Sequence, residues 1–304
     1  MPVNAKTISD DELFYGHKAC AGCGGSLAVR AALKVLGPNA VCALPAGCMS
    51  AVGFNFPQLC FANNAIITPF AATASVLSGI AAGLAAQGKS PADYPVVGFA
   101  GDGGTADIGL QALSGAIDRN DDILYICYDN EAYMNTGIQK SSLTPFGAST
   151  TTTPAGRNVH GCATQKKNLF EIVAAHDIPY AATASIGYLP DYLAKVEKAA
   201  SIRGTKFIQV IAPCPTGWGT PVDVTVDIAK EMVDCGLWPL LEYEGSAVCG
   251  QATGRLAVTR RLRQFSPVDH YVRSQGRFKA LTDEEVAGVQ QFRDSLWQRL
   301  DARL

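Results

Sequence analysis

Charged residues are scarce in this chain. Only 17% of its 304 residues are Asp, Glu, Lys or Arg, and the net charge of −2 leaves no basic excess. A nucleic-acid partner is therefore not expected, because proteins that bind nucleic acids carry a cationic surface. The hydrophobic fraction of 48% excludes a disordered chain. It predicts a large buried core or wide contact with other subunits.

Residues 35–88 contain no charged residue and no histidine. The most apolar part, residues 65–86, is long enough for a membrane-spanning helix. However, threonine, serine, glycine and proline interrupt it, and the stretch before it is rich in proline, asparagine and glycine. We therefore expect no membrane span. We expect a buried segment that packs against a cofactor and a partner chain, with Gly79 and Gly83 on one helix face.

An apolar signal region is also missing, since residues 1–6 read Met-Pro-Val-Asn-Ala-Lys. The chain nevertheless has ten cysteines. Without a secretory signal, disulfides are not expected, and a cytoplasmic location with reduced thiols is predicted. Clustered cysteines in that compartment indicate metal ligation first.

The hydrophobic pattern alternates between strands and helices, which predicts an α/β fold with a parallel sheet flanked by helices. Strands are expected at residues 41–44, 95–100, 123–128, near Tyr180 and at 207–211, and helices at residues 27–36, 75–86, 106–117, 169–176 and 189–200. Residues 136–157 form a loop whose length indicates a functional role. We expect one α/β domain over residues 1–236. Residues 237–304 are expected to be a charged, irregular C-terminal extension with a helix at 284–300, packed on the same domain or on a partner subunit.

A Gly-Asp-Gly turn lies between a predicted strand and a predicted helix, at residues 101–103. Glycine lets backbone N–H groups approach phosphate oxygens, and a helix N-terminus favours an anion. Asp102 offers the hard oxygen that Mg²⁺ prefers, and Asn130 and the carbonyl of Ala132 offer two more after the next strand. Without Gly-x-Gly-x-x-Gly or a P-loop lysine, a magnesium–diphosphate site is favoured over a nucleotide site. A plain glycine-rich turn is the alternative.

Four cysteines stand out by position. Cys20 and Cys23 form a Cys-x-x-Cys pair, Cys48 lies in a glycine turn, and Cys214 comes soon after the last predicted strand. Ligands of parallel sheets gather outside the carboxyl ends of the strands, so Cys48, Asp102, Asn130 and Cys214 are expected to converge at one edge. A Cys-x-x-Cys pair also occurs in zinc sites and redox disulfides, and structural zinc is the alternative here. The other cysteines are expected to be small core residues, namely Cys42, Cys60, Cys127, Cys162, Cys235 and Cys249.

These residues resemble a known family. Gly101-Asp102-Gly103 followed by Asn130 resembles the thiamine diphosphate motif. Residues 128–139, Tyr-Asp-Asn-Glu-Ala-Tyr-Met-Asn-Thr-Gly-Ile-Gln, are similar to the β subunit of pyruvate:ferredoxin oxidoreductase and related 2-oxoacid:ferredoxin oxidoreductases. The resemblance runs from about Gly16 to Trp218 and weakens beyond Glu244.

The resemblance implies three cofactors, namely thiamine diphosphate, Mg²⁺ and a [4Fe–4S] cluster next to the thiamine. The implied cofactor-binding residues are Gly47, Cys48, Gly101, Asp102, Gly103, Gly104, Asn130 and Ala132, with Mg²⁺ on Asp102, Asn130 and the Ala132 carbonyl. The implied cluster ligands are Cys20, Cys23, Cys48 and Cys214. Asn135 and Thr136 are expected to be catalytic residues on the reactive side of the cofactor.

The implied function is oxidative decarboxylation of a small 2-oxoacid, pyruvate or a similar one. Electrons would pass through the cluster to ferredoxin, and coenzyme A would take the acyl group. The chain has no Cys-x-x-Cys-x-x-Cys-x-x-x-Cys-Pro run for further clusters, and the glutamate that activates thiamine is expected on a partner. We therefore expect a hetero-oligomer with an α subunit that completes the thiamine site, and with a ferredoxin-like subunit that carries further [4Fe–4S] clusters.

Two departures from the family leave the substrate open. Gly25-Ser26 stands where the family often has Glu after Cys-x-x-Cys-Gly, and residues 67–74 lack a His/Phe/Glu/Asn pattern of many pyruvate members. Oxalate, which would leave no acyl group for coenzyme A, is therefore an alternative substrate. A non-redox thiamine diphosphate lyase or decarboxylase, and a cluster-binding or zinc-binding scaffold without catalysis, are alternatives of another class.

Overall fold

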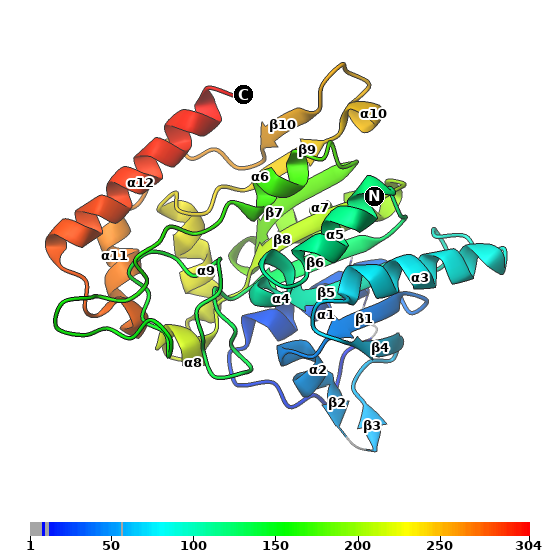
Figure 1. Cartoon of the computed structure of the whole chain (residues 1–304), viewed down its shortest axis with the longest axis horizontal. Helices are drawn as coiled ribbons and strands as arrows, with labels where there is room; N and C mark the ends of the chain where they lie inside the picture. Colours follow the sequence, from blue (N-terminus) through cyan, green and yellow to red (C-terminus); the bar gives the residue numbers. More distant parts are fainter. Residues whose placement is uncertain (1–7, 10–11, 56) are drawn as a thin grey trace.

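The computed structural model describes residues 8–9, 12–55 and 57–304. Residues 1–6, where no signal region is expected, lie outside the described residues. One sheet of eight strands runs through the molecule in the order β10-β9-β7-β8-β6-β5-β1-β4, and helices cover both of its faces (Figure 1). Its six strands from β7 to β4 are parallel, as the α/β pattern predicts.

The strands are β1 (Val41–Pro45), β2 (Phe54–Asn55), β3 (Gln58–Leu59), β4 (Asn64–Thr68), β5 (Val96–Gly101), β6 (Leu124–Asp129), β7 (Tyr180–Ser185), β8 (Lys206–Ile211), β9 (Leu241–Glu244) and β10 (Arg255–Val258). The α-helices are α1 (Gly24–Leu36), α2 (Cys48–Gly53), α3 (Thr73–Ala86), α4 (Asp102–Ala106), α5 (Leu110–Asp118), α6 (Leu169–Ala174), α7 (Leu189–Ser201), α8 (Pro215–Trp218), α9 (Thr225–Asp234), α10 (Ser246–Cys249), α11 (Val268–Arg273) and α12 (Asp283–Asp301). Two 3₁₀ turns, η1 (Ile186–Tyr188) and η2 (Gly276–Phe278), complete the set.

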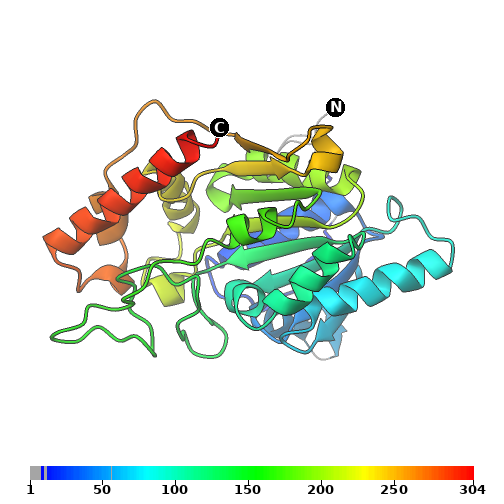
Figure 2. The same ribbon diagram turned by 45° about the horizontal axis from the view of Figure 1, so that its top comes forward.

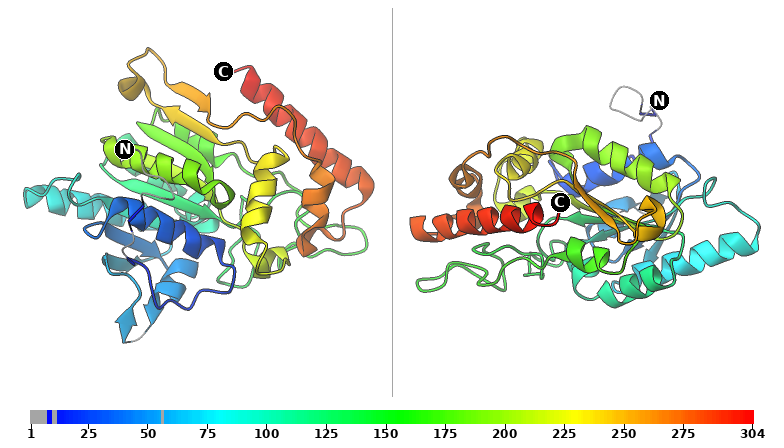
Figure 3. Two further views of the ribbon diagram at one scale, coloured as in Figure 1. Left: turned by 180° about the vertical axis from the view of Figure 1, so that it is seen from behind. Right: turned by 90° about the horizontal axis from the view of Figure 1, so that it is seen from above.

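The central strands β5 and β6 are buried on both faces, and they are runs of aliphatic, aromatic and small residues without polar alternation. Successive side chains point to opposite faces. Ile126 joins the core beneath α1 and α7, whereas Cys127 joins the core beneath α3, α5 and α6. Figures 2 and 3 show the sheet between these two layers of helices. The sheet is therefore a rigid frame for the loops at its carboxyl edge.

One predicted helix is wrong in its extent. Residues 106–117 were expected to be a single helix, but α4 ends at Ala106 and α5 begins at Leu110. The chain turns sharply between them, so that a Cβ atom on Gly109 would lie 2.0 Å from the carbonyl oxygen of Gly104. This close backbone contact, which the hydrophobic period cannot reveal, places α4 as a separate turn directly behind Asp102.

The C-terminal extension is more regular than expected. β9 pairs antiparallel with β7, and β10 pairs antiparallel with β9, so residues beyond 237 continue the main sheet. The helix α12 begins with a capping box, in which Thr282 and Glu285 each accept the other's backbone N–H, at 3.2 and 2.8 Å. A domain boundary at 236/237 stays a prediction.

The charge-free segment, residues 35–88, is only partly buried within this chain, because β1 lies in the core whereas most of β4 and α3 does not. Of α3, only Thr73, Ala74 and Leu77 are buried, and the helix extends away from the sheet (Figure 1). β4 is the outer strand of the sheet and leaves Ile66 48% and Ile67 43% exposed. Packing of this segment against a cofactor and a partner chain stays a prediction. No helix of the described residues is both long and apolar enough to cross a bilayer.

Candidate active site

The carboxyl ends of β1, β5, β6 and β8 meet at one edge of the sheet, because these strands are parallel neighbours. Cys48 follows β1, Asp102 follows β5, Asn130 follows β6 and Cys214 follows β8. The predicted convergence of these residues is confirmed. The edge has two hollows, which we call the diphosphate cleft and the cysteine cavity.

Three oxygen atoms converge at the base of the diphosphate cleft. Oδ1 of Asn130 lies 2.9 Å from Oδ1 of Asp102 and 3.0 Å from the carbonyl oxygen of Ala132. Three acceptors at such distances repel one another unless a proton or a cation lies between them. A rotated Asn130 amide donates such a proton, and Mg²⁺, which takes oxygen ligands of this kind, supplies such a cation. The residues expected to hold Mg²⁺ therefore fit the ion.

Asp102 is fully buried, and Ser141 donates a hydrogen bond to its Oδ2 at 2.5 Å. Burial and the neighbouring Asp129 carboxylate raise the pKa of Asp102 well above its usual range, while Ser141 and Lys166 act in the opposite direction. A buried carboxylate of this kind gains most from a divalent cation. Ser141 orients it, since the hydroxyl holds one oxygen and leaves the other facing Asn130.

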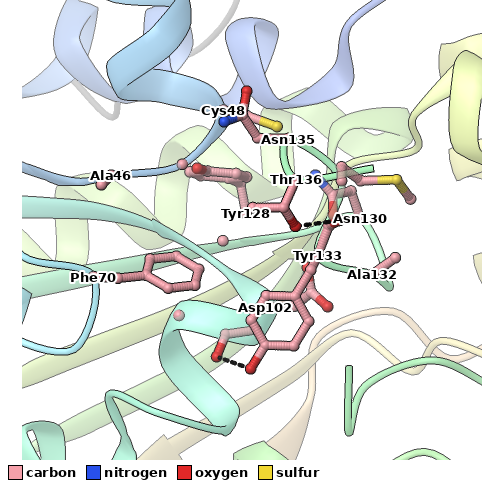
Figure 4. Close-up of a pocket in the computed structure, with 15 residues that line it drawn as sticks. Ala46, Cys48, Phe70, Asp102, Tyr128, Asn130, Ala132, Tyr133, Asn135 and Thr136 are labelled. Carbon is pink, nitrogen blue, oxygen red and sulfur yellow. Dashed lines mark hydrogen bonds between the residues drawn. The ribbon is translucent and has the colours of Figure 1, made fainter. Parts of the chain in front are cut away.

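Aromatic rings close the diphosphate cleft (Figure 4). The Tyr133 hydroxyl donates to the carbonyl oxygen of Gly103 at 3.3 Å, and its ring would lie 2.5 Å from a Cβ atom on Gly103. Phe70 would lie 3.0 Å from a Cβ atom on Gly104 and packs edge-on against Tyr133 at 5.8 Å. The open volume is only about 20 Å³. The Tyr133 and Phe70 rings therefore cover the glycine turn and leave no room for a side chain at Gly103 or Gly104.

The two residues expected to be catalytic, Asn135 and Thr136, lie on the loop after β6 and line the diphosphate cleft. Both are exposed, and the Thr136 hydroxyl donates to the Gln139 side chain at 2.5 Å. Gly47 and Gly101 line the same cleft, and both lie next to Tyr128. The sequence-predicted cofactor residues are thus brought together, and no described Lys, Arg or His lines this cleft.

The four cysteines line one cavity of about 330 Å³. Cys23 immediately precedes α1, Cys48 begins α2, and Cys214 immediately precedes α8, where its Sγ accepts the N–H of Gly217 at 3.4 Å. Cys20 is exposed, and the other three are half-buried. N–H groups that point at sulfur are typical surroundings of iron–sulfur ligands. The four cysteines therefore fit a cluster by their type and by sharing one cavity.

The four cysteine side chains do not surround a common metal position. Among the described residues, no three His, Cys, Asp or Glu side chains are close enough to hold one metal ion. Burial and the nearby thiols of Cys23 and Cys214 raise the pKa of Cys48 to about 12. A thiol in such surroundings stays protonated until a cation is bound, so loading of the cavity would release protons.

The two hollows share a wall. Cys48, Asn130, Met134 and Asn135 line both the diphosphate cleft and the cysteine cavity. Tyr128 lines the diphosphate cleft, and its hydroxyl accepts the N–H of Met49, which lines the cysteine cavity, at 3.4 Å. A cofactor in the cleft and a cluster in the cavity would therefore be neighbours.

The remaining cysteines lie elsewhere. Five of them, Cys42, Cys60, Cys127, Cys162 and Cys235, are buried, and Cys249 is half-buried. Burial raises the pKa of the Cys42 and Cys127 thiols far above their usual value, as expected for inert core thiols.

Sequence reasoning missed the charged residues behind the cleft. Asp129 and Glu131 flank Asn130, and both are fully buried against Lys166, with Nζ–oxygen distances of 2.7 and 2.8 Å. Arg277, from the C-terminal extension, contacts Glu131 at 2.6 Å. The one available signal was the pair of acids at the end of a strand that is otherwise entirely apolar, since buried acids need cationic partners.

Comparison with known proteins identifies the family. The family model described as "Thiamine pyrophosphate enzyme, C-terminal TPP binding domain" matches residues 45–210. The chain is 46% identical to the ketoisovalerate oxidoreductase subunit VorB of Pyrococcus horikoshii, over 96% of this chain and 93% of the relative. It is also 46% identical to the pyruvate synthase subunit PorB of Methanothermobacter marburgensis, over 97% of this chain and 99% of the relative.

This chain belongs to the β subunits of the 2-oxoacid:ferredoxin oxidoreductases. It is accordingly a subunit of a multi-subunit oxidoreductase and contains a thiamine diphosphate-binding domain. Among solved structures, a 2-oxoglutarate:ferredoxin oxidoreductase from Magnetococcus marinus has a TM-score of 0.56 at 21% identity, over 69% of this chain and 67% of that chain. That likeness supports the fold. Family membership also excludes the non-redox lyase as a function of this β subunit.

Proposed function

We propose that this β subunit holds the diphosphate half of thiamine diphosphate with Mg²⁺ and, beside it, a [4Fe–4S] cluster. Asp102, Asn130 and the Ala132 carbonyl would bind Mg²⁺, and Cys20, Cys23, Cys48 and Cys214 would bind the cluster. One observation carries the proposal: the diphosphate cleft and the cysteine cavity share Cys48, Asn130 and Asn135 as lining residues. The substrate carbon that loses electrons on thiamine diphosphate and the cluster that accepts them would then be separated only by these shared residues.

The proposed reaction removes CO₂ from a 2-oxoacid and joins the remaining acyl group to the sulfur of coenzyme A. The carbon–carbon bond to the carboxylate breaks, a carbon–sulfur bond forms, one proton is released, and two electrons leave one at a time for ferredoxin. Thiamine diphosphate, when bound, supplies the electron sink for the decarboxylation. The protein supplies the placement of the diphosphate, the exclusion of water by Phe70 and Tyr133, and a path for electrons past Cys48.

The proposed substrate is a small 2-oxoacid such as pyruvate. No described Lys, Arg or His of this chain lines the diphosphate cleft. Residues 67–74 supply Phe70 to the cleft, whereas Thr68 and Thr73 hydrogen-bond to each other at 3.2 Å and are buried. The names of the relatives contain ketoisovalerate and pyruvate, so pyruvate and 2-oxoisovalerate are the first two compounds to test.

We further propose that the complex contains an α subunit, which completes the thiamine site, and a ferredoxin-like subunit with further clusters. Cys20 is exposed, so the cluster edge would be open to such an acceptor.

The test uses the native complex, purified without oxygen. Iron, acid-labile sulfide and thiamine are quantified, and viologen reduction is followed with pyruvate, 2-oxoisovalerate, 2-oxoglutarate and oxalate, each with and without coenzyme A. The proposal expects coenzyme A-dependent reduction with pyruvate or 2-oxoisovalerate. Reduction by oxalate without coenzyme A would overturn the substrate assignment, and a complex that has thiamine but lacks sulfide would overturn the cluster.

A further inference from the structure

Four charged side chains are buried together directly behind the diphosphate cleft. The side chains of Asp129 and Glu131 are fully buried, that of Arg277 is 3% exposed and that of Lys166 is 15% exposed. Lys166 contacts both acids, and Arg277 contacts Glu131 at 2.6 Å. Removing four charges from water is costly, and an apolar cluster of the same volume stabilises a fold at least as well. Stability alone therefore does not explain why these four charged side chains lie beside Asn130.

Glu131 has an unusual backbone conformation, with φ at +66°. Residues other than glycine avoid this left-handed region unless their surroundings hold them there, and they collect at functional sites. Here the Glu131 N–H donates to Asp129 Oδ1 at 3.1 Å, and its carbonyl oxygen accepts the Thr144 hydroxyl at 2.7 Å. The conformation reverses the chain between Asn130 and Ala132. As a result, the Asn130 side chain lies between Asp102 and the carbonyl oxygen of Ala132, at 2.9 and 3.0 Å.

Arg277 contacts the residues of this chain reversal in two ways, directly at Glu131 and indirectly through Trp218. Its guanidinium pairs with the Glu131 carboxylate and stacks on the ring of Trp218, 3.6 Å from the ring centroid. The Trp218 indole N–H in turn donates to the carbonyl oxygen of Asn130 at 2.9 Å. Arg277 is itself fixed, because its Nε donates to Gln275 at 2.9 Å and its carbonyl accepts the N–H of Ser149 at 2.8 Å.

We propose that Arg277 is a positioning residue for the magnesium–diphosphate site. Together with Lys166 it holds Glu131 in the left-handed conformation, and thereby sets the distance between the oxygen atoms of Asn130 and Ala132. The C-terminal extension thus contributes to the cofactor site without touching the cofactor. This inference rests on the proposed function, since it assumes that these oxygens bind Mg²⁺.

The test measures metal binding in the intact complex after its cofactors other than the cluster are removed with a chelator. Thiamine diphosphate is kept saturating while Mg²⁺ is titrated, and bound Mn²⁺ in place of Mg²⁺ is examined by electron paramagnetic resonance. Arg277→Met removes the charge and the planar stacking group. We expect the Kd for Mg²⁺ to rise about tenfold or more, as for other residues that orient metal ligands. The Mn²⁺ spectrum is expected to change shape.

Arg273→Met is the matched control. Arg273 lies four positions earlier in the same extension and pairs with Asp269 on the surface, at 2.6 Å. Its loss should leave the Mg²⁺ affinity and the Mn²⁺ spectrum unchanged. Arg277→Lys keeps a positive charge but loses the planar guanidinium group that stacks on Trp218. Its Kd for Mg²⁺ should therefore lie between those of the wild type and Arg277→Met.

The outcomes separate this inference from the proposed function. An Arg277→Met complex with lower thermal stability but wild-type Kd and Mn²⁺ spectrum would overturn the positioning role and leave the ion pair purely structural. If that variant does not assemble, Arg277→Lys decides, since an unchanged Kd in it overturns the inference and a raised Kd supports it. Absence of Mg²⁺-dependent thiamine diphosphate binding in the wild type would instead refute the proposed function itself.

Discussion

The backbone N–H of Gly24 donates a hydrogen bond to the carbonyl oxygen of Pro213 at 3.2 Å. Cys23 precedes the donor and Cys214 follows the acceptor, so this bond sets two cysteines of the cavity side by side. A Cβ atom on Gly24 would lie 2.7 Å from the same Pro213 oxygen and 2.8 Å from the carbonyl carbon of Ala212. The two loops can approach this closely because residue 24 has no side chain.

Gly24→Ala is therefore expected to separate the two loops. Overpacking of this kind costs about 1–3 kcal/mol, and here it acts on the cysteine spacing directly. We expect the iron and labile sulfide of the purified complex to fall below half of the wild-type content. Gly288→Ala in α12, where a Cβ atom meets nothing within 4 Å, is the control and should keep full iron content. Full iron content in Gly24→Ala would contradict the assignment of this cavity.

Asp102→Ala should abolish Mg²⁺-dependent binding of thiamine diphosphate, because the only charged oxygen of the converging set is lost. Ser141→Ala keeps that oxygen but removes the hydroxyl that donates to Asp102 at 2.5 Å. We expect the second variant to bind Mg²⁺ about tenfold more weakly, an effect of orientation alone. Equilibrium dialysis with radiolabelled thiamine diphosphate measures both. Retained binding in Asp102→Ala would refute the site.

Tyr133→Phe should speed the binding of thiamine diphosphate. The Tyr133 hydroxyl donates to the Gly103 carbonyl at 3.3 Å and so holds the ring over the glycine turn. Loss of one hydrogen bond of about 1 kcal/mol should make it easier for the ring to move off the turn, so the association rate constant should rise about fivefold. Stopped-flow fluorescence measures it. Slower association would show that the hydroxyl contacts the cofactor itself.

His270 gives the extension a pH-dependent contact. Glu231 accepts a hydrogen bond from its ring and raises the pKa of His270. A raised folded-state pKa means that the contact stabilises fully below the unfolded value of about 6.5 and is lost as pH rises through the folded value. Since His270 is exposed, His270→Gln should lower the free energy of unfolding by about 0.5 kcal/mol or less at acidic pH. That difference should vanish at alkaline pH.

Thermal unfolding of the two proteins from acidic to alkaline pH measures this difference. Arg261→Gln is the control, because Arg261 pairs with Asp301 and this ion pair contains no histidine. A His270→Gln difference that grows with pH would contradict the assignment.

The positions of Cys48, Asp102, Asn130 and Cys214 followed from sequence because each comes after a buried parallel strand. Such strands have a strong local signal, and their topology alone fixes where their ends meet. The break between α4 and α5 could not be predicted in this way, since it depends on the contact of Gly109 with Gly104 and not on the hydrophobic period.

The strands β9 and β10 were missed for a related reason. They are short, carry charged residues such as Glu242 and Arg255, and lie at the outer part of the sheet, where burial does not shape the sequence. Likewise, nothing in the spacing of Glu131 and Arg277 connects them. Only the fold brings the C-terminal extension against the loop after β6.

The sheet ends at β4, and this outer strand has consequences for the cell that makes the protein. Ile66 and Ile67 are about half exposed, and no charged residue lies within residues 35–88 to keep a second strand away. Unpaired outer strands of this kind invite pairing between copies and aggregation. Copies produced in excess of their partner subunits should therefore precipitate or be degraded. We therefore expect that balanced synthesis of the subunits protects this protein from aggregation.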